Sequence, residues 1–283
     1  MSQSIITVLI KKISRFLLIV CLVSHCVSVV HSEESHKENP YGRFIQTEHK
    51  LRVACPAQTS EMAVLLAIGQ SNAANDAEEK HMTRYPKKVV NYFEGKCYVA
   101  ASPLLGATGE SGEFVTLLAD HLIKNHTYQS VVIISAAIGA TPISRWQRGG
   151  DLNTSLLAIL LESNKNYRIT HILWHQGETD FANKTSSDHY VKSFRSLVDS
   201  LSSIDVAAPI FIAISTKCIP GWYEKNPTAL AQMSLVDNKK IFLGANTDIL
   251  LEDKDRRDAC HFSKTGQIKT AHSYFDAIRK QAH

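Results

Sequence analysis

Short apolar runs recur along the chain and alternate with segments of helical periodicity. The runs are five to seven residues long and rich in valine and isoleucine. This pattern is typical of strands covered on both faces of a sheet. The predicted strands are 62–68, 131–136, 169–174, 210–215 and 241–245. A further short strand is expected at 97–101.

The segments between these runs place apolar residues at helical spacing. Phe114, Leu118 and Leu122 fall on one face of a helix, for example. Further helices are predicted at 152–161, 190–201 and 265–278. Strands that alternate with helices indicate β-α-β units. We therefore expect an α/β fold, a three-layer αβα sandwich around a mostly parallel five-stranded sheet.

The beginning of the chain has the layout of a secretory signal peptide. Three basic residues precede an apolar run at 16–30, and a cleavage site suits the region near Ser32. The run is shorter than the ~20 residues that a spanning helix needs, and an uncleaved anchor is the alternative. We expect a signal peptide at 1–32, an irregular N-terminal arm at 33–57 and a single domain at 58–283.

Export to an oxidising compartment favours disulfide bonds. Four cysteines follow the leader, so two disulfides with three possible pairings are expected. They are Cys55, Cys97, Cys218 and Cys260. None has the C-x-x-C spacing of a structural metal site. The net charge of +4 is spread along the chain, which argues against a nucleic-acid partner. No stable membrane association is expected once the leader is removed.

Polar residues follow the predicted strands at the sheet edge where α/β proteins bind ligands. Gly-Gln-Ser-Asn at 69–72 follows the first strand, and a glycine-containing segment from Gly139 follows the second. Gln-Gly-Glu at 176–178 follows the third, and Asp-Ala-Cys-His at 258–261 precedes the last helix. Together they supply a hydroxyl, an imidazole, a carboxylate and hydrogen-bond donors, a set that suits acyl transfer.

These four blocks resemble those of the SGNH hydrolases. The closer similarity is to the branch that contains sialate O-acetylesterases and the acetylxylan esterases of carbohydrate esterase family six. Its blocks are Gly-Gln-Ser-Asn, a glycine block ending in Trp, Gln-Gly-Glu and Asp-x-x-His. They correspond here to 69–72, 139–146, 176–178 and 258–261, in the family's order.

The resemblance implies an SGNH, flavodoxin-like fold and a serine esterase that needs no cofactor. Its expected substrate is an O-acetylated carbohydrate, either sialic acid or an acetylated polysaccharide. With the leader, it predicts a secreted or periplasmic enzyme. Two alternatives stay open: a lipid or thioester hydrolase on the same fold, and a catalytically inactive sugar-binding protein.

Three residues are predicted to carry the reaction. Ser71 is the nucleophile, His261 is the base that activates it, and Asp258 orients the imidazole from three positions earlier. The alternatives are a Ser71 that only caps the following helix and an Asp258 that only begins one.

The predicted oxyanion hole combines two backbone N–H groups, of Ser71 and Gly139, with the side-chain amide of Gln176. The wider superfamily usually has Asn at the last position. Gly139 lacks a Cβ and lets the backbone approach a substrate, and the alternative is a plain turn glycine. Gln176 could instead hold its loop in place.

Four further residues have supporting assignments. Asn72 is expected to order the turn after the nucleophile, and Glu178 to support His261 or the Gln176 loop. Arg145 and Trp146 lie where a sugar ring could stack, the alternative for Trp146 being a core position.

Position along the chain favours one disulfide pairing. Cys218 follows the fourth strand and Cys260 precedes His261, so a bond between them would hold the His261 loop beside the site. We therefore expect Cys218–Cys260 and Cys55–Cys97. His171 and His175 lie on one face of a strand without the geometry of a compact metal site, and no metal is expected.

Overall fold

The computed structural model describes residues 39–281, and the folded domain begins at Pro40. The predicted signal peptide lies outside the described residues, as does the beginning of the predicted arm. Among residues 39–281, no helix combines the length and the apolar character that a membrane crossing requires.

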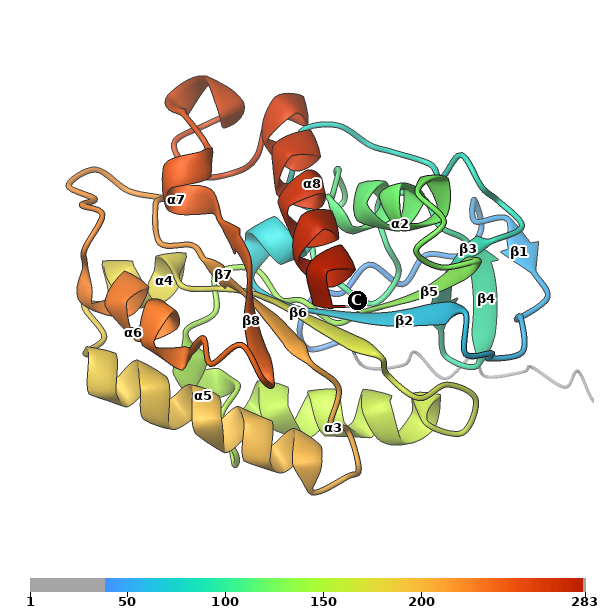
Figure 1. The fold of residues 1–283 in the computed structure, drawn as a ribbon, viewed down its shortest axis with the longest axis horizontal. Coiled ribbons are helices and arrows are strands. Elements are labelled where there is room, and N and C mark those ends of the chain that lie inside the picture. The colour runs from blue at the N-terminus through green and yellow to red at the C-terminus, as the bar shows by residue number, and fades with distance from the viewer. Residues whose placement is uncertain (1–38, 282–283) are drawn as a thin grey trace, which may run out of the picture. The chain divides into compact units, whose positions relative to one another are not determined.

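An eight-stranded sheet forms the centre of the domain (Figure 1). Its strands lie in the order β1-β4-β3-β5-β2-β6-β7-β8. The six strands from β3 to β8 in this order are parallel, while β4 and β1 run antiparallel at one edge. The strands are β1 (Arg52–Val53), β2 (Met62–Gly69), β3 (Val89–Phe93), β4 (Lys96–Val99), β5 (Ser130–Ser135), β6 (His171–His175), β7 (Ile210–Ile214) and β8 (Ile241–Asn246).

Helices cover both faces of this sheet (Figure 1). One face packs against α3 (Asp151–Ser163), α5 (Ser187–Ser202) and α6 (Pro227–Leu235). The other face packs against α2 (Val115–Lys124) and α8 (Lys264–Gln281). The short helices α4 (Glu178–Ala182) and α7 (Thr247–Leu250) follow β6 and β8. The predicted three-layer α/β architecture is therefore confirmed.

The two cores follow from the alternation of side chains along the strands. In β2, Val64, Leu66 and Ile68 join the core beneath α3 and α5, whereas Leu65 and Ala67 join the core beneath α2 and α8. Side chains of successive strand residues point to opposite faces. A strand buried on both faces is therefore apolar throughout, as the sequence pattern indicated.

All five predicted strands are present, but the sheet has three more than the predicted five. Two of the extra strands, β3 and β4, pair with each other within residues 73–109, a long segment between the first two predicted strands, and β4 overlaps the short strand expected at 97–101. In β3, the buried Asn91 interrupts the apolar run and binds the Leu105 backbone N–H at 2.8 Å. The third, β1, has only two residues and lies in the stretch expected to be irregular.

Candidate active site

Ser71 lies two residues after the end of the central strand β2 and begins the 3-10 helix η1 (Ser71–Ala73). The preceding Gly69 has φ +129°, and a Cβ there would lie 2.0 Å from the carbonyl oxygen of His175. Only glycine permits this conformation and this close approach. The next N–H, of Gln70, donates to the same carbonyl at 2.9 Å. This tight turn holds Ser71 at the carboxyl edge of the sheet.

His261 and Asp258 lie together before α8. The imidazole Nδ1 is 3.0 Å from Asp258 Oδ2, and Asp258 Oδ1 accepts the backbone N–H groups of Cys260 and His261 at 2.8 and 2.7 Å. Partial burial raises the pKa of Asp258, but the hydrogen bonds from His261 and Cys260 outweigh it and hold the pKa well below the ordinary value. Asp258 is therefore an ionised carboxylate that fixes the imidazole.

Asn72 connects the turn that carries Ser71 to the loop that carries His261. Its Nδ2 donates to Glu178 Oε1 at 2.9 Å and to the carbonyl of Cys260 at 3.3 Å. Its Oδ1 accepts the backbone N–H of Phe262 at 3.2 Å. Asn72 thus binds the residues on both sides of His261. Within residues 39–281, the hydroxyl of Ser71 makes no hydrogen bond, so the nucleophile–base contact is not closed in this structure.

Glu178 lies beneath Asn72 at the start of α4. It is completely buried, and Oε1 accepts hydrogen bonds from Asn72 Nδ2 and Ser215 Oγ, while Oε2 has no partner among the described residues. Burial raises the pKa of Glu178, against the hydrogen bonds from Asn72 and Ser215, which lower it. Its contacts brace Asn72 rather than His261 directly.

Two disulfides join the pairs expected from the sequence, Cys218–Cys260 and Cys55–Cys97. The first ties the loop after β7 to the residue before His261. The carbonyl of Cys260 also accepts a hydrogen bond from the buried Arg256, at 2.6 Å. The His261 loop is therefore fastened by a covalent bond and by side chains from two directions.

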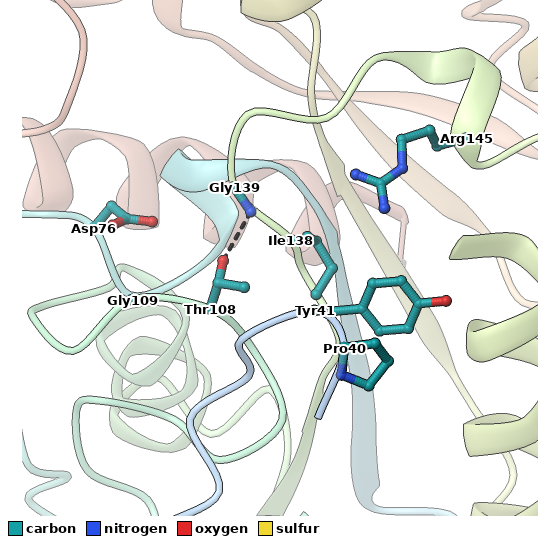
Figure 2. A pocket seen from close by; sticks show the side chains of 8 residues that line it. All are labelled: Pro40, Tyr41, Asp76, Thr108, Gly109, Ile138, Gly139 and Arg145. Carbon is teal, nitrogen blue, oxygen red and sulfur yellow. Dashed lines mark hydrogen bonds between the residues drawn. The ribbon is translucent and has the colours of Figure 1, made fainter. Parts of the chain in front are cut away.

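Gly139 lies beside the nucleophile. A Cβ built at this glycine would lie 3.8 Å from Ser71 Cβ and 3.7 Å from Asp76 Oδ2. Its backbone N–H donates to Thr108 Oγ1 at 2.8 Å (Figure 2). Gly139 is therefore near Ser71, as expected of a residue of the oxyanion hole, but its N–H is already bonded.

Gln176 differs from its predicted role. It is completely buried, and its Nε2 donates to the carbonyl of Thr141 at 2.9 Å and to Asp180 Oδ2 at 2.5 Å. Its Oε1 accepts from the hydroxyl of Tyr190. Both amide hydrogens are used, which leaves none for an oxyanion. The geometry favours the alternative in which Gln176 holds its loop.

Trp146 also differs from its predicted role. Its side chain is completely buried, packs edge-on against Trp174 and donates from Nε1 to Thr141 Oγ1 at 3.1 Å. It cannot stack on a sugar, because no face of the ring is exposed. The glycine block therefore ends in a core residue.

A cavity of about 370 Å³ opens beside Gly139 (Figure 2). Asp76 and Arg145 lie at its opposite ends, with Gly139 and Thr108 between them (Figure 2). It is lined by Pro40, Tyr41, Asp76, Thr108, Gly109, Ile138, Gly139 and Arg145. Segments far apart in the sequence therefore form one polar pocket, with the predicted binding residue Arg145 in its wall.

The charged ends of the pocket differ in their bonding. Arg145 makes a two-point ion pair with Asp151, with N–O distances of 3.1 and 2.6 Å, and lies near the ring of Tyr41. Asp76 makes no hydrogen bond within the described residues. Partial burial raises the pKa of its carboxyl, while the charges of His261 and Arg257 act to lower it. Asp76 was not identified from the sequence as a site residue. Its position, four residues after the Gly-Gln-Ser-Asn block at 69–72, could have indicated that it lies near the site.

The described part of the chain holds no group of three or more His, Cys, Asp or Glu side chains arranged to bind a metal ion. His171 and His175 are both buried in β6. His171 lies between Thr170 and Tyr128, and His175 binds Ser215. Their contacts are those of core histidines.

Comparison with known proteins identifies the family of the chain. Residues 61–280 match the family model described as "Carbohydrate esterase, sialic acid-specific acetylesterase". No curated protein sequence matches the chain.

Solved structures share the fold. A protein from Arabidopsis thaliana is 18% identical, with a TM-score of 0.61 over 76% of this chain and 96% of that one. The protein named NanS is 14% identical, with a TM-score of 0.52 over 78% and 96%. A carbohydrate acetylesterase from Xanthomonas citri is 17% identical, with a TM-score of 0.53 over 78% and 56%. At these identities the likeness is one of fold.

Proposed function

The chain belongs to the carbohydrate esterase family of sialic acid-specific acetylesterases, and on that premise we propose that it removes O-acetyl groups from a carbohydrate with Ser71, His261 and Asp258. The observation that carries the proposal is the placement of His261. Asp258 binds its Nδ1 at 3.0 Å, and Asn72, the neighbour of Ser71, binds the residues on both sides of it.

The reaction would proceed in two steps through an acyl-enzyme. Ser71 Oγ attacks the acetyl carbonyl while His261 Nε2 takes its proton, and the bond to the sugar oxygen breaks as His261 returns that proton to the sugar. Water then attacks the acetyl-serine, again losing a proton to His261, and releases acetate and free Ser71. Asp258 stays ionised throughout and stabilises the imidazolium.

The oxyanion that forms in each step requires donors beside Ser71. The Ser71 backbone N–H has no acceptor among the described residues and is available for this role. Gly139 lines the pocket close to Ser71, but its N–H donates to Thr108 Oγ1. Gln176 is left out of the proposed hole, because both of its amide hydrogens are used.

The side chains that line the pocket favour a polar substrate rather than a lipid. Asp76, Thr108 and Arg145 offer a carboxylate, a hydroxyl and a guanidinium around its opening, a set that suits the hydroxyl groups of a sugar. Sialic acid or an acetylated polysaccharide would place its ring over these side chains and its acetyl group at Ser71. Arg145 is proposed as a binding residue on this basis, and Trp146 is not.

We propose in addition that the enzyme acts outside the cytoplasm. Its two disulfides are of the kind that persist in oxidising compartments. The leader predicted at 1–32 would deliver the chain there, and residues 40–283 would fold as the esterase domain after its removal.

The test is hydrolysis of p-nitrophenyl acetate and of longer acyl esters, followed by O-acetylated sialic acid and acetylated xylan. Ser71→Ala is expected to abolish turnover, and activity should fall steeply from acetate to butyrate. Ser135→Ala is the matched control, because this buried serine has a hydroxyl with no partner in the described structure. Activity that survives Ser71→Ala, or that rises with acyl length, would overturn the proposal.

A further inference from the structure

The hydroxyl of Thr108 lies in the pocket wall, in contact with Gly139, the glycine expected in the oxyanion hole. Its Oγ1 accepts the Gly139 N–H at 2.8 Å, so this N–H is bonded to Thr108 and not free to bind a substrate oxygen. Within residues 39–281 the hydroxyl has no acceptor of its own. Its hydrogen is therefore free to point into the pocket that Thr108 lines (Figure 2).

The backbone holds Thr108 firmly in this place. Its N–H donates to the carbonyl of Ala137 at 3.1 Å, and its carbonyl accepts the N–H of Asn75 at 2.9 Å. Ala137 belongs to the loop after β5, and Asn75 follows the nucleophile turn. Thr108 is thus bound to both segments that border the nucleophile.

Thr108 and Ser71 both lie close to Gly139. A Cβ built at Gly139 would lie 3.4 Å from Thr108 Oγ1 and 3.8 Å from Ser71 Cβ. The two side chains therefore flank the same point of the backbone. The side-chain donor expected from the sequence, Gln176, has both amide hydrogens committed at 2.9 and 2.5 Å.

We propose that Thr108 is a catalytic residue whose hydroxyl donates a hydrogen bond to the oxyanion, in the place expected of Gln176. The proposal rests on the proposed esterase function. As Ser71 attacks, the electron pair of the carbonyl double bond moves to its oxygen, and Thr108 Oγ–H and the Ser71 N–H donate to that oxygen. No proton is transferred by Thr108. The Gly139 N–H bonded to Oγ1 polarises the hydroxyl and strengthens its donation.

The experiment compares kcat and KM for p-nitrophenyl acetate in three variants. Thr108→Val keeps the shape and removes the hydroxyl, and is expected to lower kcat on the order of 100-fold with little change in KM. Thr108→Ser keeps a hydroxyl and is expected to stay within about threefold of the parent enzyme. Thr116→Val removes a buried hydroxyl that has no partner in the described residues and should leave kcat unchanged.

The pH profile distinguishes a donor from a residue that acts through His261. The loss in Thr108→Val should be the same at every pH, because the substitution leaves the contact between His261 and Asp258 in place. Parent-like or raised kcat in Thr108→Val would overturn the proposal, as would an equal loss in Thr108→Ser. If Thr108→Val does not fold, Thr108→Ala is judged by the same criteria. An active Ser71→Ala would instead refute the proposed function itself.

Discussion

Asn72 Nδ2 lies 2.9 Å from Glu178 Oε1, so the residue after the proposed nucleophile is anchored to a buried carboxylate. The same side chain binds the carbonyl of Cys260 and the N–H of Phe262. The Glu178 carboxylate therefore sets the orientation of an amide that places His261. This couples the end of β6 to the geometry of the proposed nucleophile and base, although neither Asn72 nor Glu178 takes part in bond making.

Asn72→Ala is expected to lower kcat by one to two orders of magnitude with a smaller change in KM, because the loop that carries His261 loses its link to the Ser71 turn. The free energy of unfolding should fall by about 1–3 kcal/mol, since buried partners are left unsatisfied. Asn153→Ala is the matched control. Asn153 is also buried and bonded, to the carbonyl of Trp146 and to Ser200 Oγ, away from the pocket. Urea unfolding and steady-state kinetics of both variants check this, and an equal loss of kcat in both would contradict it.

Glu178→Gln is expected to become more stable relative to the parent as pH rises. Burial raises the pKa of Glu178, so the folded state holds its proton above the pH at which the unfolded state releases it. The parent therefore loses stability with rising pH, beginning near the unfolded value of ~4.3. Glutamine does not titrate and escapes this loss. Free energies of unfolding between pH 4 and 8 measure the difference, and parallel curves for the two proteins would refute it.

The sequence was sufficient for the parts of the fold and site that depend on local pattern. Apolar runs predicted the parallel strands β2, β5, β6, β7 and β8, and residue spacing paired Asp258 with His261. Both kinds of signal are carried by neighbouring residues. Of the three additional strands, β4 overlaps the short strand expected at 97–101, whereas β1 and β3 were missed because β1 has two residues and β3 contains a buried Asn.

Tertiary contacts determine which side chains near the site are free to bind a substrate, and the local sequence pattern does not reveal them. Gln176 and Trp146 stand at positions where donors and sugar-binding residues were expected, but the core engages both side chains fully. Thr108 and Asp76 come from the 73–109 segment, whose place in the pocket wall depends on the pairing of β3 and β4. A motif therefore identifies which positions border the site, and packing decides which of their side chains remain free.

The two disulfides offer a comparison in which loop length is equal. Each joins cysteines 42 residues apart, so the chain-entropy account assigns each about 4 kcal/mol of stability. Only Cys218–Cys260 is attached to the His261 loop. C218S/C260S should therefore lower kcat at least tenfold, whereas C55S/C97S should lower stability by a similar amount and leave kcat within about twofold. Urea unfolding and kinetics at 10 °C test this, and an equal effect of both pairs on kcat would contradict it.

Two buried histidines should make the protein sensitive to mild acid. Burial lowers the pKa of His171 to about 4 and that of His175 to about 3, with the charge of Arg256 also lowering the latter. In the unfolded chain both titrate near ~6.5. Between these values the unfolded state binds protons that the folded state does not, so stability falls as pH falls from 6.5 towards 4.

Each pH unit in this window is worth about 1.4 kcal/mol per histidine, so the drop from pH 6.5 to 5 is about 2 kcal/mol for each. Together the two histidines contribute to the slope of unfolding free energy against pH. His171→Gln should remove about half of that contribution, because one of the two groups no longer titrates. His272→Gln is the control at an exposed position on α8, where the ring lies beside Asp276. If His171→Gln and the parent show the same slope between pH 5 and 7, His171 takes up its proton in the folded state as it does in the unfolded state, and the assignment of a neutral His171 is wrong.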